Sequence, residues 1–257
     1  METIEMNGRK AIRRDCPLCG ESAVLASRNR YSDPLWIMKD CPRCRFVYLE
    51  AVPIYEELVA DYSWDKSSAN RDQERKQYYP LLYKISKSMR WRLHLFKRKR
   101  VEEVLQQHVS EGNVLDIGCG KGDQLRKLPI AYTPFGIEIS EAEASHAVDA
   151  VEDRGGKIVV NSAIDGLREF PDDFAAGIFM RSFLEHEADP MGVLEQTSRV
   201  LKPYGVAIIK VPNYGCVNRM LLGRRWSGFR FPDHLNYFTP KTLPAMCEKA
   251  GLTARGL

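Results

Sequence analysis

Four cysteines form two C-x-x-C pairs, Cys16/Cys19 and Cys41/Cys44, with residues 20–40 between them. Each pair can fold into a tight turn that presents two thiolates to one ion, and four thiolates give a closed tetrahedral zinc site that is structural rather than catalytic. Unrelated buried cysteines or a thioredoxin-like redox pair are the alternatives, but neither pair opens a helix after a strand. We therefore expect a zinc ribbon over residues 12–50, with its target open between nucleic acid and a purely structural role.

A second candidate site is the glycine-rich stretch Val114–Gly122, which is VLDIGCGKG. Glycines at alternate positions let the backbone approach a ligand closely. A nicotinamide-binding loop has the spacing G-x-G-x-x-G, whereas this loop has G-x-G-x-G and is followed by Asp123. Asp116 adds another negative charge just before the turn. The loop therefore favours a cationic or zwitterionic ligand without phosphate, and a dinucleotide-binding dehydrogenase is the less favoured alternative.

Glu138 ends the next apolar run along the chain, about where a doubly wound fold places the carboxylate that accepts the ribose hydroxyls. A glycine loop without phosphate preference and a ribose-binding carboxylate together suggest S-adenosylmethionine (SAM). Cys119, inside the loop, is expected to be a small packing residue rather than a nucleophile.

Two histidines are candidates for a general base, which methyl transfer requires only when the acceptor is a hydroxyl or an unactivated carbon. His186 follows the fourth predicted strand, and its alternative role is to orient the loop before Asp189. His234 lies in residues 212–239, which are too long for a simple connection and suggest a lid over the acceptor; the alternative is a solvated loop. The polar and aromatic side chains of this segment include Arg224, Arg225, Trp226, Arg230, Asn236 and Tyr237. Its arginines suit an acidic acceptor such as a phosphate or a carboxylate.

Alternating strands and helices must position these residues. Short apolar runs predict strands over residues 114–117, 135–139, 157–160, 174–180 and 205–211. Helical periodicity and capping residues predict helices over 101–109, 122–128, 140–155, 189–200 and 239–251. Ser140 with Glu143 forms a capping box, and Asp189 with Pro190 is typical of a helix start. The fold class is therefore α/β, with a doubly wound parallel sheet that binds ligands at the carboxyl ends of its strands.

Composition excludes several classes of protein. The 257 residues are 44% hydrophobic and 28% charged, which are values of a globular protein rather than a disordered or fibrous one. No apolar run approaches the length of a membrane span, and the first residues lack the apolar core of a secretory signal. Together with the paired cysteines, these absences predict a cytoplasmic protein.

The net charge of +4 is unevenly distributed, because residues 84–100 hold eight Lys and Arg and no acid. That segment is interpreted as a solvated helix face, or as a contact with RNA, nucleotide-linked substrates or an anionic membrane surface.

Three segments resemble motifs of the class I SAM-dependent methyltransferases, in the same order along the chain: Val114–Gly122, Phe135–Ser140 (FGIEIS) and Phe183–Gly205. The resemblance covers about residues 101–252. It is closest to the ubiquinone-biosynthesis O-methyltransferase-like branch, whose members often carry an N-terminal zinc ribbon followed by a tyrosine-rich segment. It implies a Rossmann-like fold, SAM as the cofactor and methyl transfer as the activity.

The resemblance also implies roles for individual residues. Carried over by position, Asp116, Gly118, Gly120 and Gly122 would line the methionine end of the cofactor, and Glu138 would hold the ribose.

On the adenine side, the resemblance implies that Ile139 packs on the base and that Ser162 and Ala163 flank its edge. Met180 and Arg181, after the fourth strand, would lie near the methionine group. His186 occupies a position close to the active site in the resembled family.

The chain departs from the family pattern at three points. Ala175 follows Phe174 where the family usually has Asp, and Tyr204 replaces the first glycine of the LKPGG motif; neither is a ligand-binding position. The third departure is length. A complete sheet of the family has seven strands, ending in a hairpin after the last helix, whereas only Leu252–Leu257 remain here. We therefore expect five strands, from a truncated form or from a sheet whose edge is covered by the bridge or a partner.

Three modules are thus expected: a zinc ribbon (12–50), a helical basic bridge (51–110) and a SAM-binding domain (111–257). The leading function is O- or C-methylation of a small-molecule or glycan-type biosynthetic intermediate. The alternative is an rRNA or tRNA methyltransferase that binds RNA through the ribbon and the basic segment. Against it, the sequence after the fourth strand is MRSFLEH rather than the Asn/Asp-Pro-Pro-Tyr/Phe motif of many nucleic-acid enzymes. A SAM-fold binding protein without turnover is the non-enzymatic alternative.

Overall fold

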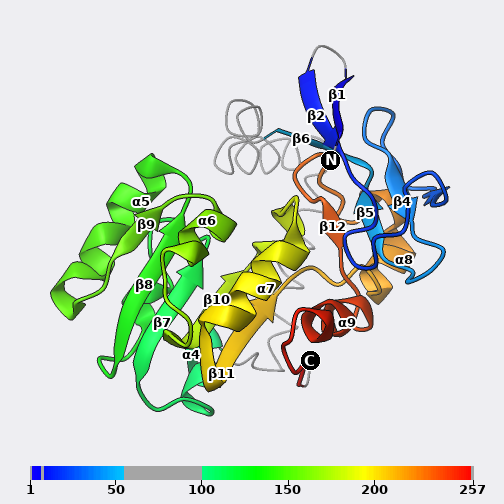
Figure 1. Ribbon diagram of the computed structural model, residues 1–257. Helices are drawn as coiled ribbons and strands as arrows, with labels where there is room; N and C mark the ends of the chain where they lie inside the picture. The colour runs from blue at the N-terminus through cyan, green and yellow to red at the C-terminus, as the bar shows by residue number, and fades with distance from the viewer. Residues whose placement is uncertain (1, 7–8, 55–99, 256–257) are drawn as a thin grey trace, which may run out of the picture. The chain divides into compact units, whose positions relative to one another are not determined.

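Five apolar runs form one parallel sheet, as predicted. The strands are β7 (Gly112–Ile117), β8 (Tyr132–Glu138), β9 (Ile158–Val160), β10 (Ala175–Arg181) and β11 (Leu201–Lys210). Their order in the sheet is β11-β10-β7-β8-β9, so the chain builds outward from β7 to one side and then continues from β10 on the other (Figure 1). Such a reversal opens a crevice at the carboxyl ends of β7 and β10, where ligands bind in doubly wound sheets.

The computed structural model describes residues 2–6, 9–54 and 100–255. They fall into two units, one of Met1–Arg13 with Ala51–Arg100 and one of Arg14–Glu50 with Val101–Leu257. The first unit contains an antiparallel sheet in the order β1 (Glu2–Met6), β2 (Arg9–Arg13), β6 (Ala51–Pro53). The tyrosine-rich segment and nearly all of the basic segment 84–100 lie outside the described residues. The expected bridge therefore stays a prediction.

Helices cover both faces of the five-stranded sheet, because alternate strand residues point to opposite faces. One core cluster joins Leu115 and Ile178 to α6 (Ala163–Arg168), α7 (Pro190–Val200) and α9 (Thr242–Lys249). The other joins Val114 and Phe179 to α4 (Val101–Gln106) and α5 (Glu141–Ala147). Figure 1 shows α7 crossing in front of β10 and β11. The Rossmann-like fold class is thereby confirmed.

Both predicted helix starts are confirmed. The hydroxyl of Ser140 accepts the backbone N–H of Glu143, and the carboxylate of Asp189 accepts that of Gly192 at 2.9 Å. The predicted helix over 140–155 is too long, since α5 ends at Ala147 and two 3₁₀ turns follow before Gly155 reverses the chain with φ 72°. The helix predicted over 122–128 is only the 3₁₀ turn Leu125–Lys127.

The cysteine-rich segment contributes a second, antiparallel sheet in the order β12-β5-β4-β3. Its strands are β3 (Ser27–Arg28), β4 (Met38–Asp40), β5 (Val47–Leu49) and β12 (Asn236–Tyr237). The last of these comes from the long segment after β11, which the sequence suggested as a lid. Asn236 pairs with Tyr48 and Tyr237 with Val47, so the two segments form one structure.

Arg14 reinforces this junction. Its guanidinium is buried and donates three hydrogen bonds to backbone carbonyls: Nε to Leu49 at 2.9 Å, Nη1 to Ala188 at 2.9 Å and Nη2 to Leu235 at 2.7 Å. Burial lowers its pKa to about 10, which still leaves it charged at neutral pH. A single side chain therefore connects the cysteine-rich segment to the loops that follow β10 and β11.

The segment after β11 also contains the short helix α8 (Val217–Leu222). Within the described residues, the parallel sheet has the five expected strands, with β11 at one edge and β9 at the other. None of the described helices is long and apolar enough to cross a membrane.

Candidate functional site

The glycine loop after β7 turns three times through positive φ, with values of 71° at Gly118, 51° at Gly120 and 79° at Gly122. A Cβ at Gly118 would lie 2.5 Å from the ring of Phe183, and one at Gly122 would lie 3.1 Å from Ala147. At Gly120, by contrast, the nearest atom would be 4.0 Å away. The loop is therefore packed against protein at its two ends and open at its middle, which leaves the backbone at Gly120 accessible to a ligand.

Glu138 sits beside this opening. One carboxylate oxygen accepts the backbone N–H of Gly120 at 2.9 Å, and the other accepts that of Ser140 at 3.0 Å. These two bonds fix the carboxylate at the carboxyl end of β8 and tie it to the glycine loop. Each oxygen keeps a lone pair for a further donor, so the group can accept both hydroxyls of a diol.

Asp116 is the more deeply buried acid of the site, with 5% of its surface exposed. Burial raises its pKa to about 8; the nearby Arg181 acts in the opposite direction, and Glu138 adds to the rise. A carboxylate in such a place is stabilised by a cationic ligand, which is what the sequence suggested for this loop.

Arg181 is held by a chain of hydrogen bonds that the sequence did not reveal. It donates through Nη1 to the side-chain oxygen of Gln124 at 3.0 Å, and Gln124 donates through Nε2 to Glu102 of α4 at 2.7 Å. Gln124 is only 6% exposed, which is unusual for a glutamine. No periodicity marks it, because it lies in a turn between β7 and β8.

Apolar side chains are exposed where β8 and β9 end. Ile139 is 38% exposed and Val160 is 51% exposed, at the ends of neighbouring strands, so both offer surface to a flat ring. Ser162 uses its hydroxyl to cap α6 by accepting the N–H of Asp165, and Ala163 is buried in the first turn. Met180, near the carboxyl end of β10, is fully buried. Cys119 is buried in the apolar core cluster of Val114 and Phe179, which agrees with a packing role.

The two candidate histidines lie together, although 47 residues of sequence separate their segments. His186 and His234 meet edge to face, with ring centroids 4.8 Å apart. Nδ1 of His186 lies 3.1 Å from a carboxylate oxygen of Asp233 and 2.8 Å from its backbone carbonyl. Arg230 pairs with the other carboxylate oxygen at 2.8 Å. Asp233 therefore orients His186 through Nδ1, while Nε2 lies on the side of Glu185.

The environments of the two imidazoles are opposite. Burial favours the neutral form of His186, but the carboxylates of Asp233 and Glu185 outweigh it, so the pKa of His186 lies above its ordinary value. Burial and the neighbouring His186 lower the pKa of His234 to about 3, and its Nδ1 lies 2.9 Å from the carbonyl of Gly228. His234 is thus neutral at physiological pH, and only His186 titrates usefully.

Glu185 completes this cluster. It is 1% exposed, its Oε1 lies 3.9 Å from Nε2 of His186, and its Oε2 has no hydrogen-bond partner within the described part of the chain. One ligand atom from each of Glu185, His186 and His234 lies within 4.8 Å of the others, a set that is chemically suited to a divalent cation. Neither Glu185 nor Asp233 was predicted, because their importance arises only from the fold.

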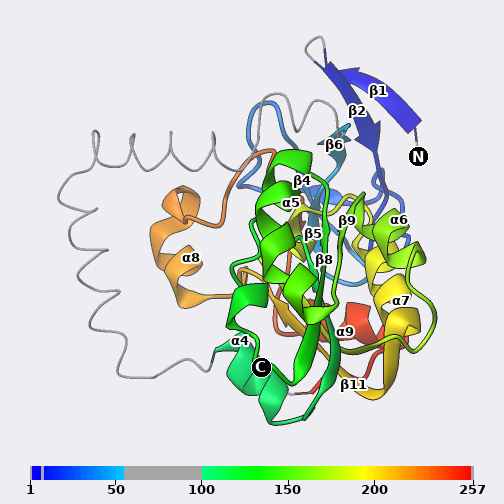
Figure 2. The same ribbon diagram turned by 90° about the vertical axis from the view of Figure 1, so that its left-hand side faces the viewer.

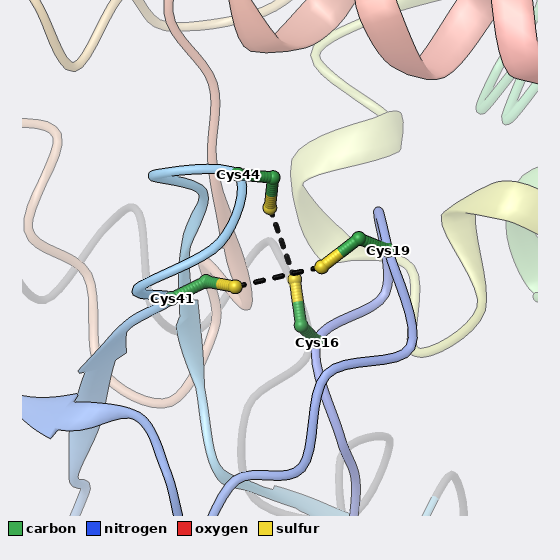
Figure 3. Close-up of side chains that lie close together, drawn as sticks. All are labelled: Cys16, Cys19, Cys41 and Cys44. Atoms are coloured by element: carbon green, nitrogen blue, oxygen red, sulfur yellow. Dashed lines mark hydrogen bonds between the residues drawn. The ribbon is translucent and has the colours of Figure 1, made fainter.

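The four paired cysteines converge, as Figure 3 shows. The Sγ atoms of Cys16 and Cys44 are 3.5 Å apart, as are those of Cys19 and Cys41, and all four sulfurs lie within 4.8 Å of one another. A tetrahedron of Zn–S bonds of about 2.3 Å has edges of about 3.8 Å. The geometry therefore fits one zinc ion and is too wide for disulfides, whose sulfurs are about 2.05 Å apart.

We predict that the imidazole of His186 titrates above the pKa of free histidine and that Asp233→Asn lowers this pKa, because the imidazolium loses its adjacent carboxylate. The Cε1 proton shifts followed by NMR across pH measure the effect, with His186→Gln providing the assignment and the exposed Asp153→Asn serving as the control. An unchanged His186 titration in Asp233→Asn would contradict the arrangement.

Comparison with known proteins shows the family to which the chain belongs. Residues 89–255 match a family model described as a methyltransferase domain. A chain of the Haloferax volcanii complex between the Trm112 methyltransferase activator and a methyltransferase is 22% identical, with a TM-score of 0.51, 60% of this chain and 68% of that chain covered.

Two further solved structures are less similar in shape. A SAM-dependent methyltransferase from Archaeoglobus fulgidus is 23% identical, with a TM-score of 0.47, covering 62% of this chain and 71% of that one. The [4+2]-cyclase SpnF is 22% identical, with a TM-score of 0.44 and 59% of this chain covered; the match spans 56% of the cyclase. The comparison with curated proteins gave no match. The family match covers more than half of the chain, which therefore belongs to the methyltransferase-domain family.

Proposed function

We propose that this enzyme transfers the methyl group of SAM to an oxygen or carbon atom of a small-molecule or glycan-type biosynthetic intermediate. The pairing of His186 with Asp233 carries this proposal. A base is dispensable for many nitrogen acceptors but is required for a hydroxyl or an unactivated carbon. An imidazole oriented by a carboxylate, on the turn that follows β10, is the group that such an acceptor needs.

The chain's own residues would divide the work as follows. Nε2 of His186 takes the acceptor proton, and the carboxylate of Asp233 stabilises the imidazolium that results. His234 packs edge to face on His186 and limits its movement, so it serves as a positioning residue rather than as the second base expected from sequence. The bound cofactor supplies an electrophilic methyl on a sulfonium, and the protein mainly supplies alignment.

The cofactor residues implied by resemblance fit this picture. We assign Asp116 and the backbone of Gly118, Gly120 and Gly122 to the methionine end, and Glu138 to the ribose. The buried, poorly solvated carboxyl of Asp116 favours the cationic amino group of a zwitterion.

The remaining assignments concern the adenine and the methionine group of the cofactor. Exposed Ile139, together with Val160, offers an apolar face to adenine, and the start of α6 at Ser162 and Ala163 borders its edge. The backbone of Met180 and the tethered guanidinium of Arg181 lie toward the methionine group, where a guanidinium suits a carboxylate.

Glu138→Gln is expected to weaken SAM binding at least tenfold, because an amide accepts one ribose hydroxyl less well and presents a donor to the other. Isothermal titration calorimetry with SAM measures the affinity, and a thermal melt confirms that the glycine loop is intact. The control is Glu141→Gln, an exposed acid three residues further along. Equal affinities for Glu138→Gln and the unmodified enzyme would remove Glu138 from the ribose site.

The acceptor test is SAM consumption with fractionated cell extract, followed by mass analysis of the methylated product. His186→Asn is expected to lower turnover by about 10² to 10⁴, the usual contribution of a general base. Turnover of the unmodified enzyme should rise as pH increases to the pKa of His186 and then level off, since only the neutral imidazole accepts a proton. His234→Asn should keep this pH profile.

The same assay distinguishes the alternative of an rRNA or tRNA methyltransferase. Product methylated on an RNA nucleoside, or an affinity for RNA that falls steeply with salt, would overturn the proposal of a small-molecule acceptor.

The arginines of the segment after β11 give less support to an acidic acceptor than the sequence suggested, because two of them already have partners within the protein. Arg230 is paired with Asp233, and Arg224 donates to the carbonyls of Arg30 and Ser32.

We further propose that Cys16, Cys19, Cys41 and Cys44 hold one structural zinc ion and that residues 12–50 are a zinc ribbon. A cytoplasmic location belongs to the same proposal, because C-x-x-C pairs stay available to metal in a reducing compartment. Membership of the ubiquinone-biosynthesis O-methyltransferase-like branch is also proposed, on the motifs and the ribbon together.

One zinc per chain is expected by plasma mass spectrometry, and Cys44→Ser should lose it and lower the melting temperature, since the binding free energy of a structural ion contributes to folding. Cys216→Ser, outside the cluster, is the matched control. Metal-free protein with unchanged stability would exclude a zinc ribbon.

A further inference from the structure

The helix α8 presents an apolar face to solvent. Val217, Met220 and Leu221 are 66%, 68% and 78% exposed, and Leu222 is 52% exposed. The first three are spaced i, i+3, i+4, so they lie on one side of the helix. No residue of α8 is buried, which is the reverse of a helix that packs on a core. Exposed large apolar residues occur singly on most proteins, but four within six residues call for an explanation.

Residues within and beside α8 pack against the rest of the protein. The exposure of its apolar side chains therefore does not result from a poorly packed segment. Arg219 lies 4.1 Å above the ring of Tyr214, and Trp226 is 7% exposed and packs against Tyr214 and Phe229. Arg224 donates to the backbone of the cysteine-rich segment. Figure 2 shows α8 standing at the outer edge of its unit, away from the parallel sheet.

The charges of the segment that carries α8 have one sign. Residues 212–232 contain four arginines and no aspartate or glutamate. Arg224 and Arg225, directly after the helix, are exposed, and so is Arg30 on the neighbouring turn to which Arg224 is bonded. Aliphatic side chains flanked by arginines match the two layers of an anionic bilayer surface, where acyl chains lie beneath phosphate groups.

We propose that α8 and its adjoining arginines dock on an anionic phospholipid bilayer. Val217, Met220, Leu221 and Leu222 enter the interface, while Arg225 and Arg30 contact lipid phosphates. A protein partner fits less well, because a helix of six residues is about 9 Å long and cannot alone supply the roughly 800 Å² per partner of a stable interface. A bilayer has no such minimum, since each inserted side chain contributes separately. Because the same segment carries Asp233 and His234, docking would bring the acceptor site close to the membrane.

Sedimentation with vesicles tests the proposal on the full chain without cofactor or acceptor, so its outcome does not depend on methyl transfer. Vesicles of equal parts phosphatidylglycerol and phosphatidylcholine should bind the protein, and pure phosphatidylcholine vesicles should bind it at least tenfold more weakly. Binding to the anionic vesicles should fall when the salt concentration is raised to about 0.5 M, where charges are screened.

The double variant Met220→Asp/Leu221→Asp should bind anionic vesicles at least tenfold more weakly than the unmodified chain, and both side chains are exposed enough for folding to be unaffected. The matched control, Ile130→Asp, replaces an aliphatic residue that is 89% exposed elsewhere on the enzyme and should bind as the unmodified chain does. Binding that the double variant leaves intact would assign it to another segment, such as the basic residues 84–100, and overturn the proposal. So would the absence of vesicle binding, or a concentration-dependent dimer in gel filtration that the double variant abolishes.

Discussion

The buried guanidinium of Arg14 is the interaction on which the arrangement of His186 and His234 depends. A charged group without water must place its N–H donors on protein acceptors, and Arg14 does so on carbonyls from three separate segments. Two of those segments bear His186 and His234. The backbone bonds from Leu235 to Glu185 and from Leu49 to Leu235 run through the same junction. The geometry of the histidine pair is therefore set by the cysteine-rich segment as much as by the parallel sheet.

A different constraint, the cost of burying carboxylates, governs the ends of β7 and β8. Asp116 is kept in a poorly solvated place, and Glu138 is fixed by two backbone donors. A cation beside Asp116 would favour its charged form, which burial otherwise disfavours, and the fixed carboxylate of Glu138 can accept two neighbouring hydroxyls. Arg181, held through Gln124 to Glu102 of α4, acts against the rise that burial causes in the pKa of Asp116. The two sites thus differ, since backbone carbonyls solvate the charged guanidinium of Arg14, whereas burial disfavours the charged form of Asp116.

Features that depend on neighbouring residues along the chain could be predicted from the sequence. All five parallel strands, the caps at Ser140 and Asp189, the positive-φ glycines and the convergence of two C-x-x-C pairs follow from periodicity and residue type. It did not predict β12, since a strand of two residues has no periodicity and exists only through its pairing with β5. Asp233 was missed for the same reason, because its effect on His186 acts across the fold rather than along the chain. The helix over 140–155 was predicted too long, since sequence periodicity does not separate α-helix from the 3₁₀ turns that follow Ala147.

The contact between Arg14 and Leu235 joins residues 221 positions apart, and this has a consequence for how the protein is made. The cysteine-rich segment leaves the ribosome early, yet one edge of β5 receives its partner strand only when residues 236 and 237 emerge. Until then that edge of β5 carries unpaired backbone groups, which are a template for pairing with other chains. Loop closure over so long a separation is also slow. The junction that positions His186 and His234 therefore forms only after residues 236 and 237 have been made, and a nascent chain is open to misassembly until then.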